Sequence, residues 1–167
     1  MNIVLYQPEI PENTGNIGRT CAAANTALHL IEPLGFRLTG KKLRRAGMVY
    51  WEHLDVRRYI NFYEFLEKNF TQNTNAKLWM ATTKAEKIYT QAVFGSEDFL
   101  MFGKESAGIP EEILVDYKET CIRIPMLDTS RSLNLSNSVS IVLYEALRLQ
   151  NFAGMQLAGS LHRLEWE

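Results

Sequence analysis

The stretch Thr120–Asn151, TCIRIPMLDTSRSLNLSNSVSIVLYEALRLQN, carries the pattern on which the predicted fold depends. It begins with a short apolar run, crosses a polar loop and ends in the strongest helix signal of the chain. Apolar residues recur there at spacings of three and four from Leu135 to Leu147, which places them on one helix face. The stretch therefore predicts a strand, a loop and an amphipathic helix from Leu135 to about Asn151.

The same alternation of short apolar runs and helical patterns extends through the rest of the chain. The expected strands are Asn2–Tyr6, Leu28–Ile31, Asp55–Tyr59, Lys77–Ala81, Phe99–Phe102 and Thr120–Ile124. The further expected helices are Glu12 to about Thr26, Thr39–Gly47 and Asn61–Phe70. Strands that alternate with helices predict an α/β fold, with a mostly parallel sheet flanked by helices.

Length and composition set bounds on the class of protein. The chain has 167 residues, 46% of them apolar and 22% charged, which predicts a single domain. About residues 153–167 lack a clear period and are expected to form a loosely held tail. Eighteen basic and 19 acidic side chains give a net charge of -1. This balance excludes a histone-like polycation, so nucleic-acid binding has to be argued from local charge.

The sequence also predicts the compartment. The first residues lack the basic and apolar regions of a signal peptide, and no apolar run approaches the ~18 residues of a membrane span. Cys21 and Cys121 lie far apart in apolar segments, which favours buried free thiols in a reducing cytoplasm. The three histidines have no metal-ligand spacing, so no metal is expected.

The first polar segment is Asn13–Thr20, NTGNIGRT, near the start of the first helix. A dinucleotide-binding turn is one hypothesis for its two glycines. However, eight residues with two prolines separate the first strand from Gly15, whereas that fingerprint follows its strand directly. Helix packing explains the glycines, but not the polar side chains of Asn13, Asn16 and Arg19 on the same turns.

Two further polar segments each follow an apolar strand. They are Phe102–Pro110, FGKESAGIP, and Ile124–Asn137, IPMLDTSRSLNLSN. Ligands bind open α/β sheets at the carboxyl ends of strands, where these loops are expected to lie. An ordinary loop and a helix cap from Asn134 or Ser136 are the alternative interpretations. The second segment nevertheless carries more polar groups than a cap requires.

Taken in order, these segments resemble the SPOUT RNA methyltransferases, and among them the small stand-alone TrmL/YibK-type tRNA 2'-O-methyltransferases. The resemblance covers nearly the whole chain except the tail. It departs at Lys104 and Ala107, where such proteins more often carry a proline and an arginine. The matching stretches are NIVLY at 2–6, IP at 10–11, NTGNIGRT at 13–20, IEPLGF at 31–36, KKLRRAG at 41–47, ATTK at 81–84, LMFGKESAGIP at 100–110 and RIPMLDTSRSLNLSNSVSIVLYEA at 123–146.

The resemblance implies a C-terminal trefoil knot whose loops bind S-adenosylmethionine. The activity it implies is methyl transfer to the ribose 2'-hydroxyl of the wobble nucleotide, position 34, with S-adenosylhomocysteine as product. The expected substrates are leucine tRNAs with cytidine or a modified uridine at that position. The implied cofactor-binding positions are Ala81, Gly103, Ile124 and Ser132, with Thr82, Met126, Leu133 and Asn134 as neighbours.

Catalytic and dimer roles follow from the same resemblance. Arg19 is expected at the reacting ribose, with Asn13 orienting it or contributing to the dimer. The implied assembly is a homodimer formed through the knotted face by the first and last helices. Gly15 and Gly18 would then serve the partner subunit, the cofactor or both.

Local charge favours an RNA partner. Residues 37–58 carry seven basic and two acidic side chains, a net charge of +5, and the remainder carries −6. Lys41, Lys42, Arg44 and Arg45 are therefore predicted to bind the tRNA anticodon stem-loop, with Tyr50 and Trp51 as stacking aromatics. Arg131 and Tyr144 are further candidates. The alternative for the charged segment is a solvated helix face. The alternatives for the function are an RNA- or nucleotide-binding domain without activity, and methylation at another RNA site.

Overall fold

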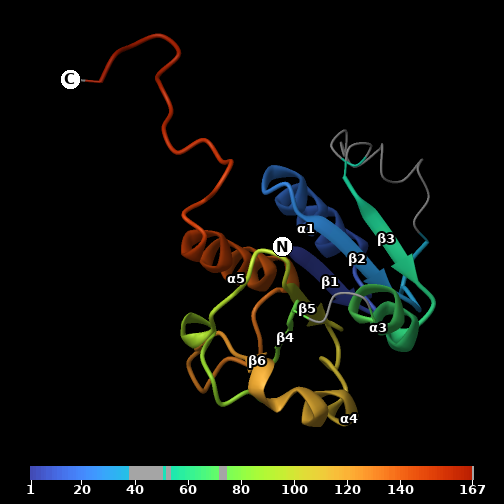
Figure 1. The fold of residues 1–167 in the computed structure, drawn as a ribbon. Helices are drawn as coiled ribbons and strands as arrows, with labels where there is room; N and C mark the ends of the chain where they lie inside the picture. Colours follow the sequence, from blue (N-terminus) through green and yellow to red (C-terminus); the bar gives the residue numbers. More distant parts are fainter. Residues whose placement is uncertain (38–50, 52–53, 72–74, 167) are drawn as a thin grey trace.

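The computed structural model describes residues 1–37, 51, 54–71 and 75–166. Its centre is a six-stranded parallel sheet in the order β3-β2-β1-β5-β4-β6 (Figure 1). The strands are β1 Asn2–Tyr6, β2 Ala27–Ile31, β3 Val56–Tyr59, β4 Leu78–Ala81, β5 Phe99–Gly103 and β6 Cys121–Ile122. The α-helices are α1 Pro11–Ala23, α3 Phe62–Phe70, α4 Glu111–Leu114 and α5 Leu135–Leu149, and the 3-10 helices are η2 Tyr89–Gln91 and η3 Val115–Thr120. This confirms the predicted α/β class and parallel sheet.

Helices cover both faces of the sheet because its strands are apolar on both sides. In β1, Ile3 and Leu5 pack with α1 and α5, whereas Val4 packs with α3 and the α4–η3 segment. Strands buried on both faces are typical of parallel sheets. Ile17 from α1 and Val139 from α5 are fully buried in the first of these two cores.

All strands are parallel, but the side of β1 on which the chain places successive strands changes between β3 and β4. The change lies between the neighbouring strands β1 and β5. The chain builds outward from β1 to β3 on one side, and β5, β4 and β6 occupy the other side. Such a switch point leaves a crevice at the carboxyl ends of the strands, where ligands bind in open α/β sheets. Tyr6 and Gly103 are register partners at this point. Gly103 has φ +100°, and a Cβ there would lie 2.6 Å from the Tyr6 carbonyl oxygen, so close pairing requires glycine.

The largest differences between predicted and observed element boundaries are in three places. Helix α1 ends at Ala23 because Asn25 adopts φ 47° and turns the chain into β2. Strand β6 is shorter than expected, since η3 continues to Thr120 and Arg123 makes an isolated bridge to Ile88. Helix α5 ends at Leu149, before residues 151 and 152, which both have positive φ. The predicted helix Thr39–Gly47 lies outside the described residues.

The last residues follow α5 without helix or strand. Residues 156–166 are all exposed, and in Figure 1 the red C-terminal trace leads away from the sheet. No helix in the described part of the chain is long and apolar enough to cross a membrane.

Candidate active site

A pocket of about 600 Å³ opens beside the carboxyl ends of β4 and β5. Its walls come from the loops that follow β4, β5 and β6, together with the first turns of α1 and α5. All eight positions that the family resemblance assigns to the cofactor line this one pocket: Ala81, Thr82, Gly103, Ile124, Met126, Ser132, Leu133 and Asn134. Asn13 and Arg131 line it as well.

The strand ends hold two of these positions in place. Ala81 and Gly103 are the last residues of β4 and β5, so the sheet fixes their backbone. The Thr82 amide donates to the Ile122 carbonyl over 2.9 Å, which extends the β4–β6 pairing by one residue. Backbone groups and small side chains therefore form this wall of the pocket, and they leave room for a ligand against the main chain.

Glu105 joins the loop after β5 to the start of α1. Its carboxylate accepts from the Glu9 amide at 2.9 Å, the Ile10 amide at 3.3 Å and Asn13 Nδ2 at 3.1 Å. Two of these donors are backbone amides immediately before α1, where a negative charge is favourable. The carboxylate therefore caps the helix and fixes the orientation of the buried Asn13 side chain.

The orientation of Asn13 in turn sets that of Asn134. With its amide nitrogen directed at Glu105, Asn13 presents Oδ1 to Asn134 Nδ2 at 2.9 Å. Asn134 then presents its own Oδ1 to the Ser136 and Asn137 amides and caps α5. These hydrogen bonds connect Glu105, Asn13 and Asn134. They join the loop after β5, the first turn of α1 and the start of α5. The predicted cap by Asn134 is confirmed.

A second carboxylate, that of Glu9, also joins the segment before α1 to the loop after β5, and here the loop is the donor. Glu9 accepts from the Ser106 amide and from Ser106 Oγ, each over 2.8 Å. These two hydrogen bonds lower the pKa of the Glu9 carboxyl below its usual value. Sequence reasoning did not assign roles to Glu9, Glu105 or Ser106. The only signal was the unusual density of polar residues after β5.

Gly18, one of the two glycines of the first polar segment, packs closely inside the chain. Both lie within α1, and a Cβ on Gly18 would lie 2.5 Å from the Trp51 ring. The sequence had left Gly18 between the cofactor and the partner subunit, but its close neighbours are Trp51 and Leu54. Trp51 is partly buried and packs against the core, and its stacking on RNA stays a prediction.

Arg19 and Tyr144 are predicted site residues that do not line the pocket. Arg19 is exposed on α1, and Tyr144 on α5 is 42% exposed. Within the basic segment, Arg57 pairs with Asp55 and Arg58 pairs with Glu32, so local anions neutralise both. Four further basic residues of that segment lie outside the described residues: Lys41, Lys42, Arg44 and Arg45.

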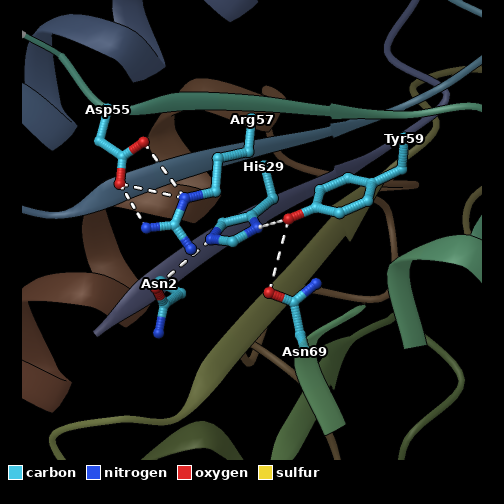
Figure 2. Close-up of polar contacts among 6 residues, drawn as sticks. All are labelled: Asn2, His29, Asp55, Arg57, Tyr59 and Asn69. Carbon is cyan, nitrogen blue, oxygen red and sulfur yellow. Dashed lines mark hydrogen bonds and ion pairs between the residues drawn. The ribbon is translucent and has the colours of Figure 1, made fainter. Parts of the chain in front are cut away.

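A buried polar network lies between β1, β2, β3 and α3 (Figure 2). His29 is fully buried, with Nδ1 at 2.8 Å from the Tyr59 hydroxyl and Nε2 at 3.3 Å from Asn2 Oδ1. Because Asn2 Oδ1 can only accept, the neutral ring donates from Nε2 and accepts from Tyr59 at Nδ1. Burial, reinforced by the charge of Arg57, lowers the pKa of His29 to about 4. None of these residues lines the pocket.

Comparison with known protein families identifies the family of this chain. Residues 1–144 match the SpoU rRNA methylase family. This chain belongs to that family. It is therefore a methyltransferase, which confirms the predicted family resemblance and enzyme class. Among relatives, the tRNA (cytidine(34)-2'-O)-methyltransferase of Saccharophagus degradans is 48% identical over 92% of this chain and 97% of its own length.

Solved structures of SpoU methyltransferases share the fold. One, from work on the 2-OH methylation of C/U34 on tRNA, is 44% identical, with a TM-score of 0.83 over 90% of this chain and 96% of that one. The SpoU methyltransferase AviRb from Streptomyces viridochromogenes, solved in complex with AdoMet, is 22% identical, with a TM-score of 0.80 over 92% of this chain and 58% of that one. In the described part of this chain, no group of three or more His, Cys, Asp or Glu residues is arranged to hold a metal ion.

Proposed function

We propose that this SpoU-family protein transfers the methyl group of S-adenosylmethionine to the ribose 2'-hydroxyl of nucleotide 34 in tRNA. The target base is cytidine or a modified uridine, in leucine tRNAs. The observation that carries the proposal is that all eight motif positions expected to bind the cofactor line one pocket at the switch point of the sheet. The relative from Saccharophagus degradans, which matches nearly end to end, favours this substrate.

The pocket suits S-adenosylmethionine in size and chemistry. Its volume of about 600 Å³ lies within the usual range for sites of small ligands. Ile124, Met126 and Leu133 offer apolar surface to an adenine ring, while Ser132 and the backbone at Gly103 offer hydrogen bonds to polar groups. These residues would hold the cofactor, and S-adenosylhomocysteine would leave as product. No metal is needed for this chemistry.

In the reaction, a bond forms between the ribose oxygen and the methyl carbon, the carbon–sulfur bond breaks, and the hydroxyl proton passes to water. The bound cofactor supplies a methyl group that is already activated by its sulfonium. The protein therefore contributes mainly alignment, which can account for roughly 7–11 kcal/mol of a barrier. A guanidinium group offers donors and no acceptor, so Arg19 acts by donating hydrogen bonds to the 2'-oxygen or the neighbouring phosphate.

A homodimer is the assembly that fits this role of Arg19. Arg19 does not line the pocket of its own chain, although Asn13 on the same helix does. Helices α1 and α5 pack side by side, with Thr20 Oγ1 and Ser140 Oγ 3.4 Å apart. Ile141 and Tyr144 on α5 remain 36% and 42% exposed. A partner subunit seated on these helices would bury them and carry its own Arg19 toward this pocket.

Three further expectations belong to the same proposal. The RNA element bound is the anticodon stem-loop, and the compartment is the cytoplasm. The C-terminal segment forms a trefoil knot, although threaded chains are rare in proteins. The support for the knot is that residues 124–134 cross the pocket before α5, with Asn134 bonded to Asn13 at the far end of the chain.

The decisive experiment is incubation with labelled S-adenosylmethionine and total tRNA, followed by nucleoside mapping. We expect a 2'-O-methyl group at position 34. Arg19→Ala should reduce turnover at least a hundredfold while leaving cofactor affinity unchanged, because Arg19 acts on the ribose. Label at another nucleotide would refute the wobble assignment, and near-normal turnover of Arg19→Ala would refute its role. Cofactor binding without any transfer would indicate a binding domain.

A further inference from the structure

Lys104 is one of the two residues at which the second polar segment departs from the family pattern, and it lines the pocket. It is half-buried and follows Gly103 at the carboxyl end of β5. Its ammonium group lies 3.4 Å from Gln7 Oε1, a neutral amide oxygen. Lys104 makes no ion pair with any described residue.

The carboxylates near Lys104 are already bound elsewhere. Glu105 accepts from two backbone amides and Asn13, and Glu9 accepts twice from Ser106. The Lys104 charge lowers the pKa of Glu9, so the two groups are close, yet the hydrogen bonds of Glu9 go to Ser106. By contrast, Lys84 on the opposite rim forms an ion pair with Glu111 at 2.8 Å. The Lys104 ammonium group, whose hydrogen-bond partner is the neutral Gln7 amide, therefore keeps donors that can bind an anion.

Gln7 holds this lysine from an uncommon backbone conformation. It has φ 44°, in the left-handed region, immediately after β1, and its amide donates to the Ile31 carbonyl over 3.0 Å. A non-glycine residue in this region is uncommon, and such residues cluster at functional sites. The turn places the side chain of Gln7 beside the end of β5, where it accepts from Lys104.

The ligand that fits this cation is a phosphate. In RNA the 3'-phosphate is attached to the carbon next to the one that bears the 2'-hydroxyl. A 2'-hydroxyl brought to this pocket therefore carries a phosphate with it. We propose, on the basis of the proposed function, that Lys104 binds the RNA phosphate beside the target ribose and that Gln7 is the residue that positions it. The methionine carboxylate of the cofactor is the competing anion, and the experiment separates the two.

The test compares Lys104→Met, which keeps length without charge, with Lys104→Arg, which keeps charge. A matched control is Lys77→Ala, because Lys77 immediately precedes β4 and so lies at the amino end of that strand, whereas the pocket lies at its carboxyl end. For each protein we would measure methylation kinetics on tRNA, tRNA affinity at several salt concentrations, and S-adenosylhomocysteine affinity by calorimetry.

We expect Lys104→Met to raise the KM for tRNA roughly tenfold and to reduce the salt dependence of tRNA binding by about one phosphate contact. Cofactor affinity should not change, Lys104→Arg should recover most of the loss, and Gln7→Ala should raise KM more than it lowers kcat. Unchanged tRNA affinity in Lys104→Met would overturn the proposal, as would weaker S-adenosylhomocysteine binding with normal tRNA affinity. Absence of methylation by the unaltered protein would instead refute the proposed function.

Discussion

His29 shows how a titratable side chain can be held neutral in the core. Its ring stacks on Tyr59 at 5.7 Å and meets Phe65 and Phe99 edge to face. The Tyr59 hydroxyl bonds Nδ1 and Asn2 Oδ1 bonds Nε2, so both ring nitrogens of the neutral imidazole have partners (Figure 2). Burial and the nearby charge of Arg57 act together to disfavour the charged ring, so His29 is held neutral.

This network makes stability depend on pH. The folded-state pKa of His29 is about 4, below the unfolded value near 6.5, so the unfolded chain binds the proton more tightly. His29 therefore contributes stability above pH ~6.5, and that contribution is lost as the pH falls toward 4. The loss is on the order of 3 kcal/mol. Urea unfolding measured from pH 7 to pH 4 should show it.

The control is His162→Gln in the exposed tail, which should keep the pH dependence of the native chain. His29→Gln should be less stable at pH 7 and should lose the part of the slope that His29 supplies. An unchanged slope in His29→Gln would show that other groups cause the acid sensitivity.

At the scale of elements, the pocket depends on how two helices begin. Helix α1 begins with Ile10 at its cap position, which offers no side-chain acceptor, so the Glu105 carboxylate from the loop after β5 bonds the neighbouring amides. Helix α5 begins at Leu135 with Asn134 at its cap position, and the Asn134 side-chain nitrogen donates to Asn13. The two helix starts are thus connected, and a change at one is transmitted to the other.

Two substitutions at Asn134 separate the cap from the link. Asn134→Ala removes both and should cost about 1 kcal/mol of unfolding free energy. Asn134→Asp keeps an acceptor for the Ser136 amide but sets a carboxylate against Asn13 Oδ1, so stability should change less. Both should weaken S-adenosylmethionine binding. Denaturant unfolding and calorimetry measure the two effects, and normal cofactor affinity in Asn134→Asp would show that the link does not shape the pocket.

At the scale of the whole molecule, charge is distributed unevenly. The net charge of −1 averages a +5 segment and a −6 remainder. Of the seven basic residues in residues 37–58, Arg57 and Arg58 are neutralised by ion pairs across and beside β3. The charge available to RNA is therefore concentrated before β3.

Replacement of Lys41, Lys42, Arg44 and Arg45 by alanine tests this distribution. We expect tRNA affinity to fall strongly and its salt dependence to flatten, because fewer phosphates are neutralised on binding. Cofactor affinity should stay as in the native chain, since all four are predicted to bind RNA and none of them the cofactor. Filter binding at several salt concentrations measures the first effect. Native tRNA affinity at moderate salt would contradict the predicted RNA surface.

Local patterns were sufficient for the elements and for much of the pocket. Apolar runs marked five of the six described strands, β3 with its two arginines being the exception, and a period of three and four marked α5, because burial of a face leaves its signature in neighbouring residues. The eight cofactor positions came from ordered motifs, and the sheet brings them together because parallel strands end at one edge.

The sequence by itself thus determined the class of fold and the order of its strands, and its family resemblance supplied eight of the residues that line the pocket. Only the tertiary structure decided how these residues hold one another. Asn13 meets Glu105 and Asn134 across 92 and 121 positions, and Gly18 accommodates Trp51. Lys104 donates a hydrogen bond to Gln7, which lies 97 positions away in the sequence. Hydrophobic periodicity reports which face of an element is buried, but it carries no information about which polar side chain lies opposite, because that depends on the packing of the whole chain.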